Sequence, residues 1–272
     1  MVRSLWSAAT GMNAQQTNVD TIANNLANVN SAGYKAQKAQ FKSLLYQTLQ
    51  STTTTANGDP KPTTSQVGLG VRTSSINNIY TQGSLLEAAS DTAFAIEGDG
   101  FFAVQGEDGI TYYTRNGDFT WAIGTNGGMT LTNQDGLPVL NTAGRAITLN
   151  RSYIASRISI SQDGEIMYPD EDNNPQPIGI SIGVYQFSNP GGLERYGDTL
   201  LTATEASGNA INEARNANVK PSRIIQGYLE GSNVSVADEM VNLIVAQRAY
   251  EMNSKAITTS DSMMETANNL KR

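Results

Sequence analysis

Four acidic side chains in the middle of the sequence have the clearest capacity for chemistry: Asp91, Glu97, Asp99 and Asp118. A glycosidase uses two such carboxyl groups, one as an acid and the other as a nucleophile or base. However, Asp99 lies in Gly-Asp-Gly and Asp118 follows Asn-Gly, where a short side-chain acceptor stabilises a turn. The sequence therefore favours structural turns over catalysis, and we predict that the protein is not an enzyme.

Metal and cofactor chemistry has less support still. The sequence contains no cysteine and no histidine, which excludes disulfides, thiolate catalysis and histidine-ligated metals. The acidic run at residues 170–172 lacks the spaced oxygen ligands and the closing glutamate of an EF-hand, so we expect a solvated loop. A phosphate-binding loop is followed by a lysine and by the start of a helix, and Gly68-Leu69-Gly70 is followed by neither. No metal or cofactor is predicted.

Charge and hydropathy restrict the possible partners. The net charge is −7, and no stripe of lysine and arginine is present, so we expect no nucleic-acid binding. Lys35, Lys38 and Lys42 are interpreted as a solvated face. No apolar run approaches the thickness of a membrane, so no membrane insertion is predicted. The N-terminal residues do not form a cleavable signal peptide, which favours the cytoplasm unless a dedicated export route exists.

The elements that would organise the chain are two terminal helices, predicted over residues 2–30 and 236–268. Ser4 is the expected cap of the first helix and residues 31–33 its end, while Ser235 is the expected cap of the second. Apolar side chains recur every seven residues in both segments, which places them on one seam of each helix. Such a stripe is usually the buried face of a globular helix, but both stripes are terminal and the middle can close by itself. We therefore favour an assembly interface, formed by Leu5, Met12, Val19, Leu26, Val236, Leu243, Tyr250, Ile257 and Met264.

Between the helices the sequence is β-like. Residues 41–49 form a short amphipathic piece, a polar tract at residues 51–62 is typical of a flexible loop, and residues 66–80 alternate as a strand does. From residue 81 to 213 short apolar runs are separated by glycine-containing turns, as in an antiparallel sandwich or barrel. Residues 94–96 and 101–104 are expected to be strands joined by a tight connection. A returning strand is expected at residues 223–229.

These observations predict an α+β fold with three parts. Residues 1–33 and 234–272 provide the terminal α-helices of a coiled-coil domain. Residues 34–80 and 214–233 provide an extended β arm and connector. Residues 81–213 form a central antiparallel all-β domain.

The whole sequence resembles the bacterial flagellar rod and hook proteins. The N-terminal run from Ala8 to Met12, continued by residues 23–35 (Ala-Asn-Asn-Leu-Ala-Asn-Val-Asn-Ser-Ala-Gly-Tyr-Lys), resembles one signature of that family. Residues 230–234 and 240–261 resemble its C-terminal signature, and residues 96–102 and 113–119 its β-domain motifs. Within the family the chain is most similar to the distal-rod branch, while a proximal-rod or hook paralogue remains an alternative.

The resemblance implies a structural role. It implies a helical homopolymer with contacts to proximal-rod proteins, the hook protein and the basal-body rings. It also implies export by the flagellar type III apparatus without signal cleavage, and a periplasmic place in the basal body. The tract from residue 46 to about 66 matches a rod-stiffening segment, and Tyr46, Gln47, Thr53, Pro60 and Pro62 are its candidate residues. A secreted glycan-active β protein is the alternative from a different class.

Overall fold

A computed structural model describes residues 2–50, 65–124, 127–170, 172–197, 199–216 and 219–270. Two compact units are present. The first unit consists of residues 1–27, 37–78 and 235–272, and the second of residues 28–36 and 79–234. Within the described residues, neither helix has the length and apolar character needed to cross a membrane.

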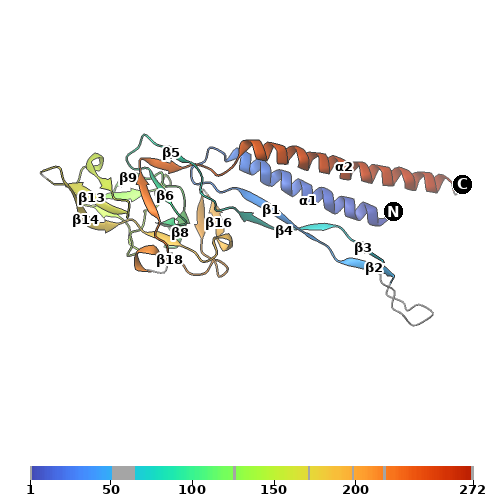
Figure 1. The fold of residues 1–272 in the computed structure, drawn as a ribbon, viewed down its shortest axis with the longest axis horizontal. Coiled ribbons are helices and arrows are strands. Elements are labelled where there is room, and N and C mark those ends of the chain that lie inside the picture. The colour runs from blue at the N-terminus through green and yellow to red at the C-terminus, as the bar shows by residue number, and fades with distance from the viewer. Residues whose placement is uncertain are drawn as a thin grey trace. The chain divides into compact units, whose positions relative to one another are not determined.

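Two long helices dominate the first unit. α1 (Val2–Ala27) and α2 (Val236–Asn269) pack side by side (Figure 1). The Ser235 hydroxyl accepts a hydrogen bond from the Asp238 backbone amide at 3.5 Å, so the predicted cap of α2 is confirmed. The predicted cap of α1 is wrong, because α1 begins at Val2 and Ser4 lies within it. α1 ends at Ala27, where a turn through residues 28–33 begins.

The rest of the first unit is a pair of two-stranded ribbons. β1 (Gln37–Ser43) pairs antiparallel with β4 (Val71–Asn78), and β2 (Tyr46–Gln50) pairs antiparallel with β3 (Ser65–Gly68). α1 packs against both β1 and β4, and the Val71 backbone amide donates to the Thr10 hydroxyl at 3.3 Å. The amphipathic piece predicted at residues 41–49 is therefore strand, and α1 is covered by a ribbon as well as by α2.

The second unit is all β apart from three short 3-10 helices in its described residues. Its sheets have the orders β16-β17-β8-β7-β15-β18, β11-β10-β9, β12-β13-β14, β19-β6 and β20-β5, and every pairing is antiparallel. The strands are β5 (Leu85–Glu87), β6 (Phe94–Glu97), β7 (Phe101–Gln105), β8 (Thr111–Thr114), β9 (Thr120–Ile123), β10 (Met129–Thr132), β11 (Thr148–Leu149), β12 (Ser159–Ile160), β13 (Glu165–Pro169), β14 (Pro175–Ser181), β15 (Val184–Gln186), β16 (Glu194–Gly197), β17 (Leu200–Thr202), β18 (Ile211–Asn212), β19 (Arg223–Gln226) and β20 (Tyr228–Glu230). The 3-10 helices are Ala155–Arg157, Pro190–Gly192 and Glu213–Arg215.

The connection between β6 and β7 differs from the hairpin expected there. Both strands form where the apolar runs predict them, but β6 pairs with β19 and β7 pairs with β8 and β15. The predicted returning strand is β19 and β20, separated at Gly227, whose φ is +77°. β6 therefore pairs with a strand that is distant in sequence and not with β7, because residues 223–230 pair with the edges of β5 and β6.

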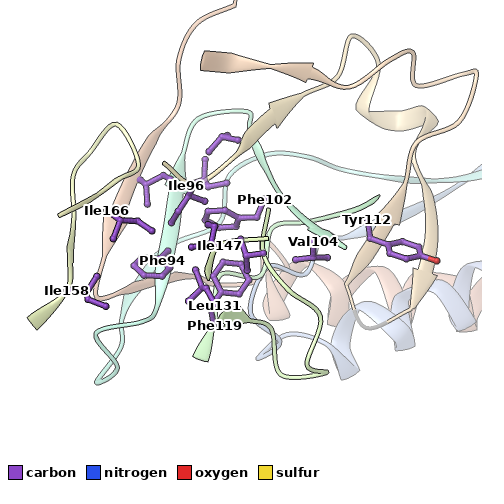
Figure 2. Close-up of a cluster of buried hydrophobic side chains, with 14 of the residues drawn as sticks. Phe94, Ile96, Phe102, Val104, Tyr112, Phe119, Leu131, Ile147, Ile158 and Ile166 are labelled. Atoms are coloured by element: carbon purple, nitrogen blue, oxygen red, sulfur yellow. The ribbon is translucent and has the colours of Figure 1, made fainter. Parts of the chain in front are cut away.

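The core of the second unit lies among these sheets. Phe94, Ile96, Phe102, Phe119 and Leu131 point toward one another within it (Figure 2). Phe102 and Phe119 meet edge to face with ring centroids 5.1 Å apart, an arrangement that adds to the stabilisation from burial. Burial of this many large side chains gives the unit its own stabilising interior.

The α+β class is confirmed, since the described elements are strands and three short 3-10 helices, with one long α-helix at each end. The division into three parts at residues 33, 80, 213 and 234 stays a prediction, because its parts are defined by roles in an assembly.

Candidate functional site

The first candidate surface is the contact between α1 and α2. The predicted seam residues of α1 are Leu5, Met12, Val19 and Leu26, and all four are half-buried. Small or branched neighbours on the same helix, Ala8, Ala14 and Ile22, are buried more completely. The apolar surface of α1 is therefore covered within one chain to a considerable degree.

The predicted seam of α2 is covered less. Leu243, Ile257 and Met264 are half-buried, whereas Val236 and Tyr250 are exposed. Ala246 is the buried hydrophobic residue of this helix in the described chain. The structure therefore brings part of the predicted set together, and whether these nine residues form an assembly interface stays a prediction.

Gly11 of α1 lies against a side chain of α2. A Cβ atom added at Gly11 would lie 2.9 Å from the side-chain nitrogen Nδ2 of Asn253. Glycine at this point of α1 leaves room for the Asn253 side chain, although glycine inside a helix costs about 1 kcal/mol relative to alanine. Sequence periodicity did not identify Gly11, since glycine carries no hydrophobic signal.

Asn25 is a polar member of the same packing region that lies almost fully buried. Its side-chain amide donates to the Gln37 carbonyl and accepts from the Gln37 amide, both at 2.8 Å. It also donates to the Glu239 carboxylate at 3.3 Å. Burial raises the pKa of the Glu239 carboxyl above its ordinary value, and the bond from Asn25 opposes that change. Asn25 therefore joins α1, β1 and α2 through hydrogen bonds that the heptad pattern did not predict.

The candidate stiffening residues lie only partly within the described chain. Tyr46 and Gln47 are exposed on β2, next to the exposed Leu45 and Leu49. Thr53, Pro60 and Pro62 lie outside the described residues. The rod-stiffening role of this segment stays a prediction.

A buried cluster of three charged side chains lies in the second unit. Glu230, at the end of β20, accepts from the Lys35 ammonium at 2.6 Å and from the Arg115 guanidinium at 3.1 Å. The Gly83 backbone amide also donates to its carboxylate at 3.0 Å. The Lys35 ammonium donates further to the Thr81 carbonyl at 2.8 Å. These side chains are at most 5% exposed, so one carboxylate holds two cations away from water.

The cluster carries one more positive than negative charge. Burial lowers the pKa of the Lys35 ammonium, and the Glu230 carboxylate opposes that shift. Arg115 lies over the Phe101 ring at 5.1 Å, and its Nε is the buried side-chain polar atom without a hydrogen-bond partner among the described residues. Removal of one partner from a buried ion pair typically costs about 3–5 kcal/mol. Glu230 is therefore the residue on which both cations depend.

The solvated lysine face predicted from the sequence is wrong for Lys35. Lys38 and Lys42 are exposed as expected, but Lys35 is 4% exposed. The reason is its partner, Glu230, which follows almost two hundred residues later in the chain. No local pattern distinguishes such a lysine from a surface one.

A close backbone contact at Gly33 and the hydrogen bonds of Asn233 hold the segments next to the charged cluster in place. Gly33 has a φ of +70°, and a Cβ atom there would lie 2.4 Å from the Asn116 nitrogen. Asn233 accepts from the Ala36 amide at 2.7 Å and donates to the Ile79 carbonyl at 2.8 Å. The segments that flank the two terminal helices in sequence are thus tied into the second unit by side-chain hydrogen bonds.

The carboxylates considered for catalysis do not form a site. Asp91, Glu97 and Asp99 are exposed, and Asp118 accepts from the Gln134 side chain at 2.5 Å while its backbone amide donates to Asn116. Across the residues that the structure describes, no group of three or more acidic side chains could hold a metal ion. The side-chain acceptor of this turn is therefore Asn116, whereas the Asp118 carboxylate, which was expected in that role, bonds to a residue sixteen positions further along the chain.

One open groove in the second unit has a volume of about 580 Å³. Its lining includes Thr130, Asn150, Tyr153 and Ile178, and among the residues that the structure describes no carboxylate lines it. A glycosidase needs two carboxyl groups beside the bound sugar. The groove therefore offers no support for glycan hydrolysis.

Three sequence families match the chain. The "Flagella basal body rod protein" family matches residues 5–35, the "Flagellar hook protein FlgE/F/G D1 domain" residues 95–168, and the "Flagellar basal body rod FlgEFG protein C-terminal" residues 225–270. Each matched segment contains one residue of the buried cluster, namely Lys35, Arg115 or Glu230.

Full-length relatives are similar throughout. The flagellar basal-body rod protein FlgG of Borreliella burgdorferi is 44% identical, with 100% of both chains covered. FlgG of Agrobacterium fabrum is 40% identical over 96% of this chain and 97% of that one. The flagellar hook-basal body complex protein FlhP of Bacillus subtilis is 30% identical with both chains covered completely. The solved flagellar hook protein FlgE2 of Helicobacter pylori matches 64% of this chain and 47% of its own at 15% identity and a TM-score of 0.24, too low for a structural argument.

Proposed function

The chain belongs to the family of flagellar basal-body rod proteins, and we propose that it polymerises into a rigid, hollow helical tube, the distal rod, which transmits motor torque to the hook. Membership confirms the resemblance expected from the sequence, including its distal-rod branch, because the full-length relatives at 44% and 40% identity are named FlgG. The chain is a structural rod subunit of the flagellar basal body.

The observation that carries the polymer proposal is the uneven coverage of α2. Met240, Ile244, Val245 and Met252 are all more than half exposed on a helix that α1 covers on one side. Monomeric proteins rarely leave a contiguous apolar surface of this kind open to water. Packing against other copies would bury it and would supply the hydrophobic free energy for assembly.

We propose that each part of the chain has a different role in the polymer. The terminal helices of many copies form an inner coiled-coil tube, and the second unit forms an outer wall. The arm, including Tyr46 and Gln47, lies against neighbouring copies and opposes bending. The interface is heterologous, because a contact between two different surfaces continues into a filament and does not close on itself.

The buried charge cluster supports a mechanical role for the second unit. Lys35 and Glu230 are close in sequence to the starts of β1 and α2, and they are bonded to each other and to Arg115. Load that enters along either segment would be shared by one buried network. This arrangement fits a subunit that must pass torque without unfolding.

Partners and location follow from the same proposal. We expect contacts with proximal-rod proteins, the hook protein and the basal-body rings, at a periplasmic position. We also expect export by the flagellar type III apparatus without signal cleavage. The absence of cysteine from the sequence suits a protein that crosses a membrane before it assembles.

Polymerisation can be tested on the purified full chain. Concentrated protein should form straight tubes in electron micrographs, with a gain in helical circular dichroism as the helices become ordered in the assembly. In dilute solution, limited proteolysis should remove the terminal helices before it cuts the second unit. A monodisperse chain at high concentration, with its terminal helices fully protected, would contradict the proposal.

The paralogue alternatives are separated by a complementation experiment. The gene should restore motility to a strain that lacks the distal-rod protein but not to one that lacks the proximal-rod paralogue. The reverse result would assign the chain to the proximal rod.

A further inference from the structure

The chain passes between the two units four times, after residues 27, 36, 78 and 234. Next to these passages lies a set of hydrogen-bonded residues of the second unit, which we call the junction and which comprises residues 33–36, 79–83 and 230–233. The Gly33 backbone amide, six residues after the end of α1, donates to the Glu230 carbonyl at 2.7 Å. Glu230 lies six residues before the start of α2. The segments that lead into the two helices therefore meet directly.

Asn233 is the side chain that joins all three segments of the junction. It accepts from the Ala36 amide at 2.7 Å, and it donates to the Ile79 carbonyl at 2.8 Å and to the Thr81 hydroxyl at 2.9 Å. The Ile79 amide also donates to the Ala36 carbonyl at 2.8 Å. One asparagine thus links the chain before β1, the chain after β4 and the chain before α2.

The buried charges hold the junction on the second unit. The Glu230 carboxylate accepts from the Lys35 ammonium at 2.6 Å and from the Gly83 amide at 3.0 Å, both within the junction. It also accepts from Arg115, which follows β8, at 3.1 Å. All of these partners belong to the second unit. The bonds of the junction therefore do not involve the helices.

The junction shortens the loop that must close when α1 and α2 pair. Ala27 and Val236, the last residue of α1 and the first of α2, lie about 210 positions apart along the chain, whereas the path through the bonded Gly33 and Glu230 spans about 12. The entropic cost of closure rises as the logarithm of loop length, so the shorter loop favours pairing by roughly seventyfold. Such help matters, because isolated helices are marginal in water.

The first contact beyond the junction is in place within the first unit. α1 ends and α2 begins at the same end of the helix pair (Figure 1). Asn25, in the last turn of α1, donates to Glu239, in the first turn of α2, at 3.3 Å. The helices are thus bonded to each other close to the residues where the junction joins their flanking segments.

We propose that the junction is a closing device for the helix pair. It forms with the second unit, and α1 and α2 then pair from the ends whose flanking segments the junction holds together. The inference goes beyond the proposed function, because it concerns one chain in dilute solution and needs no contact with another copy.

Loop length tests this inference directly. An insertion of about 24 glycine and serine residues between Val234 and Ser235 triples the closing loop, so pairing of α1 with α2 should weaken about fivefold. The same insertion after Gly136, in an exposed turn with nothing within 4 Å of an added Cβ, lies outside that loop and should leave pairing unchanged. Hydrogen exchange of the α1 and α2 amides in the dilute full chain measures both variants.

A second measurement weakens the junction itself. Asn233→Ala should lower the protection of the Gly33 and Ile79 amides against exchange by roughly tenfold, and α1 and α2 should lose protection with them. Asn212→Ala is the matched control, because it removes two bonds between a side chain and the backbone elsewhere in the second unit. It should leave the exchange of both helices unchanged.

Several results would overturn the inference. Equal effects of the two insertions, or no effect of either, would show that the helices pair without the junction. Loss of protection at Gly33 and Ile79 in Asn233→Ala, with α1 and α2 unaffected, would show the same. None of these measurements requires tubes, so the proposed polymer can fail while the junction keeps its role, and the reverse.

Discussion

The second unit buries Phe94, Phe102 and Phe119 almost completely, whereas α2 in the first unit leaves Val245, Met252 and Met263 more than half exposed. The three phenylalanines lie among strands that are far apart in sequence but pack together within one chain. The second set lies on a helix with a single long partner. The difference shows that the second unit buries its large apolar side chains within one chain, and it fits the proposal that other copies cover the helical part of the first unit.

Polar groups show the same contrast. Glu230 is fully enclosed by partners from its own unit, while the charges of α2 remain largely in water, as in the exposed pair of Arg248 and Glu251. Exposed pairs contribute about 0–1 kcal/mol, whereas loss of one partner of a buried pair costs several times more. Substitutions in the second unit should therefore affect folding, and substitutions on the outer helix faces should affect assembly.

The largest expected effect concerns the arm of the first unit. Deletion of residues 47–65 should convert straight tubes into bent or flexible ones, because neighbouring copies lose the contacts that oppose bending. Electron microscopy of the assembled deletion variant measures this directly. Straight tubes from that variant would end the stiffening role of the segment and would leave rigidity to the helices and the second unit.

Glu230→Gln tests whether the second unit depends on its buried charges. The amide keeps the shape but leaves the Lys35 and Arg115 cations without an anion, so the free energy of unfolding should fall by about 3–5 kcal/mol. Urea unfolding followed by circular dichroism measures the change. Glu97→Gln, at an exposed position on β6, is the matched control and should change stability by less than about 0.5 kcal/mol. Equal effects of the two substitutions would show that the cluster is not stabilising.

Gly33→Ala should have the next largest effect on stability. The φ of +70° and the contact with the Asn116 backbone together predict a loss of about 2–4 kcal/mol. Gly144→Ala is the control, since Gly144 has a φ of +76° but nothing within 4 Å of the added Cβ, so only the backbone strain of about 1 kcal/mol applies. If both variants unfold at the same urea concentration, close packing at Gly33 has no energetic role.

The smallest expected effect is a pH dependence of the helix pair. Burial raises the pKa of Glu239 in the folded chain, so its contribution to stability is fully present below the ordinary glutamate pKa and is lost as the pH rises through the raised value. Glu239→Gln keeps the acceptor for Asn25 and should abolish this loss, with a gain on the order of 0.5 kcal/mol at neutral pH for a half-buried group. Thermal unfolding of α1 and α2 at pH 4 and pH 7 would detect it, and an unchanged pH dependence in the variant would assign the effect to another group.

The elements themselves could be predicted because their signals are local. Heptad spacing predicted both helices, Ser235 predicted the start of α2, and the apolar runs at residues 94–96 and 101–104 predicted β6 and β7. The cap at Ser4 failed for a local reason too, because α1 begins before it. The candidate catalytic residues Asp99 and Asp118 were assigned to turns on the same local grounds.

Pairings and burial could not be predicted in this way. The partner of β6 is β19, and the partner of Lys35 is Glu230, and in both cases the two members are separated by more than a hundred residues. Strand type and charge are visible in sequence, but the surface that a strand edge or a lysine meets depends on how distant segments come together.

The sequence by itself determined the two helices, the β-rich middle and the resemblance to the rod and hook family, since periodicity, turn residues and motifs are properties of neighbouring positions. Only the tertiary structure decided that Lys35, Arg115 and Glu230 form one buried cluster and that α1 covers one stripe of α2 while another stays open. Burial is the physical reason, because the free energy of a side chain depends on what surrounds it in space, and residues far along the chain supply those surroundings.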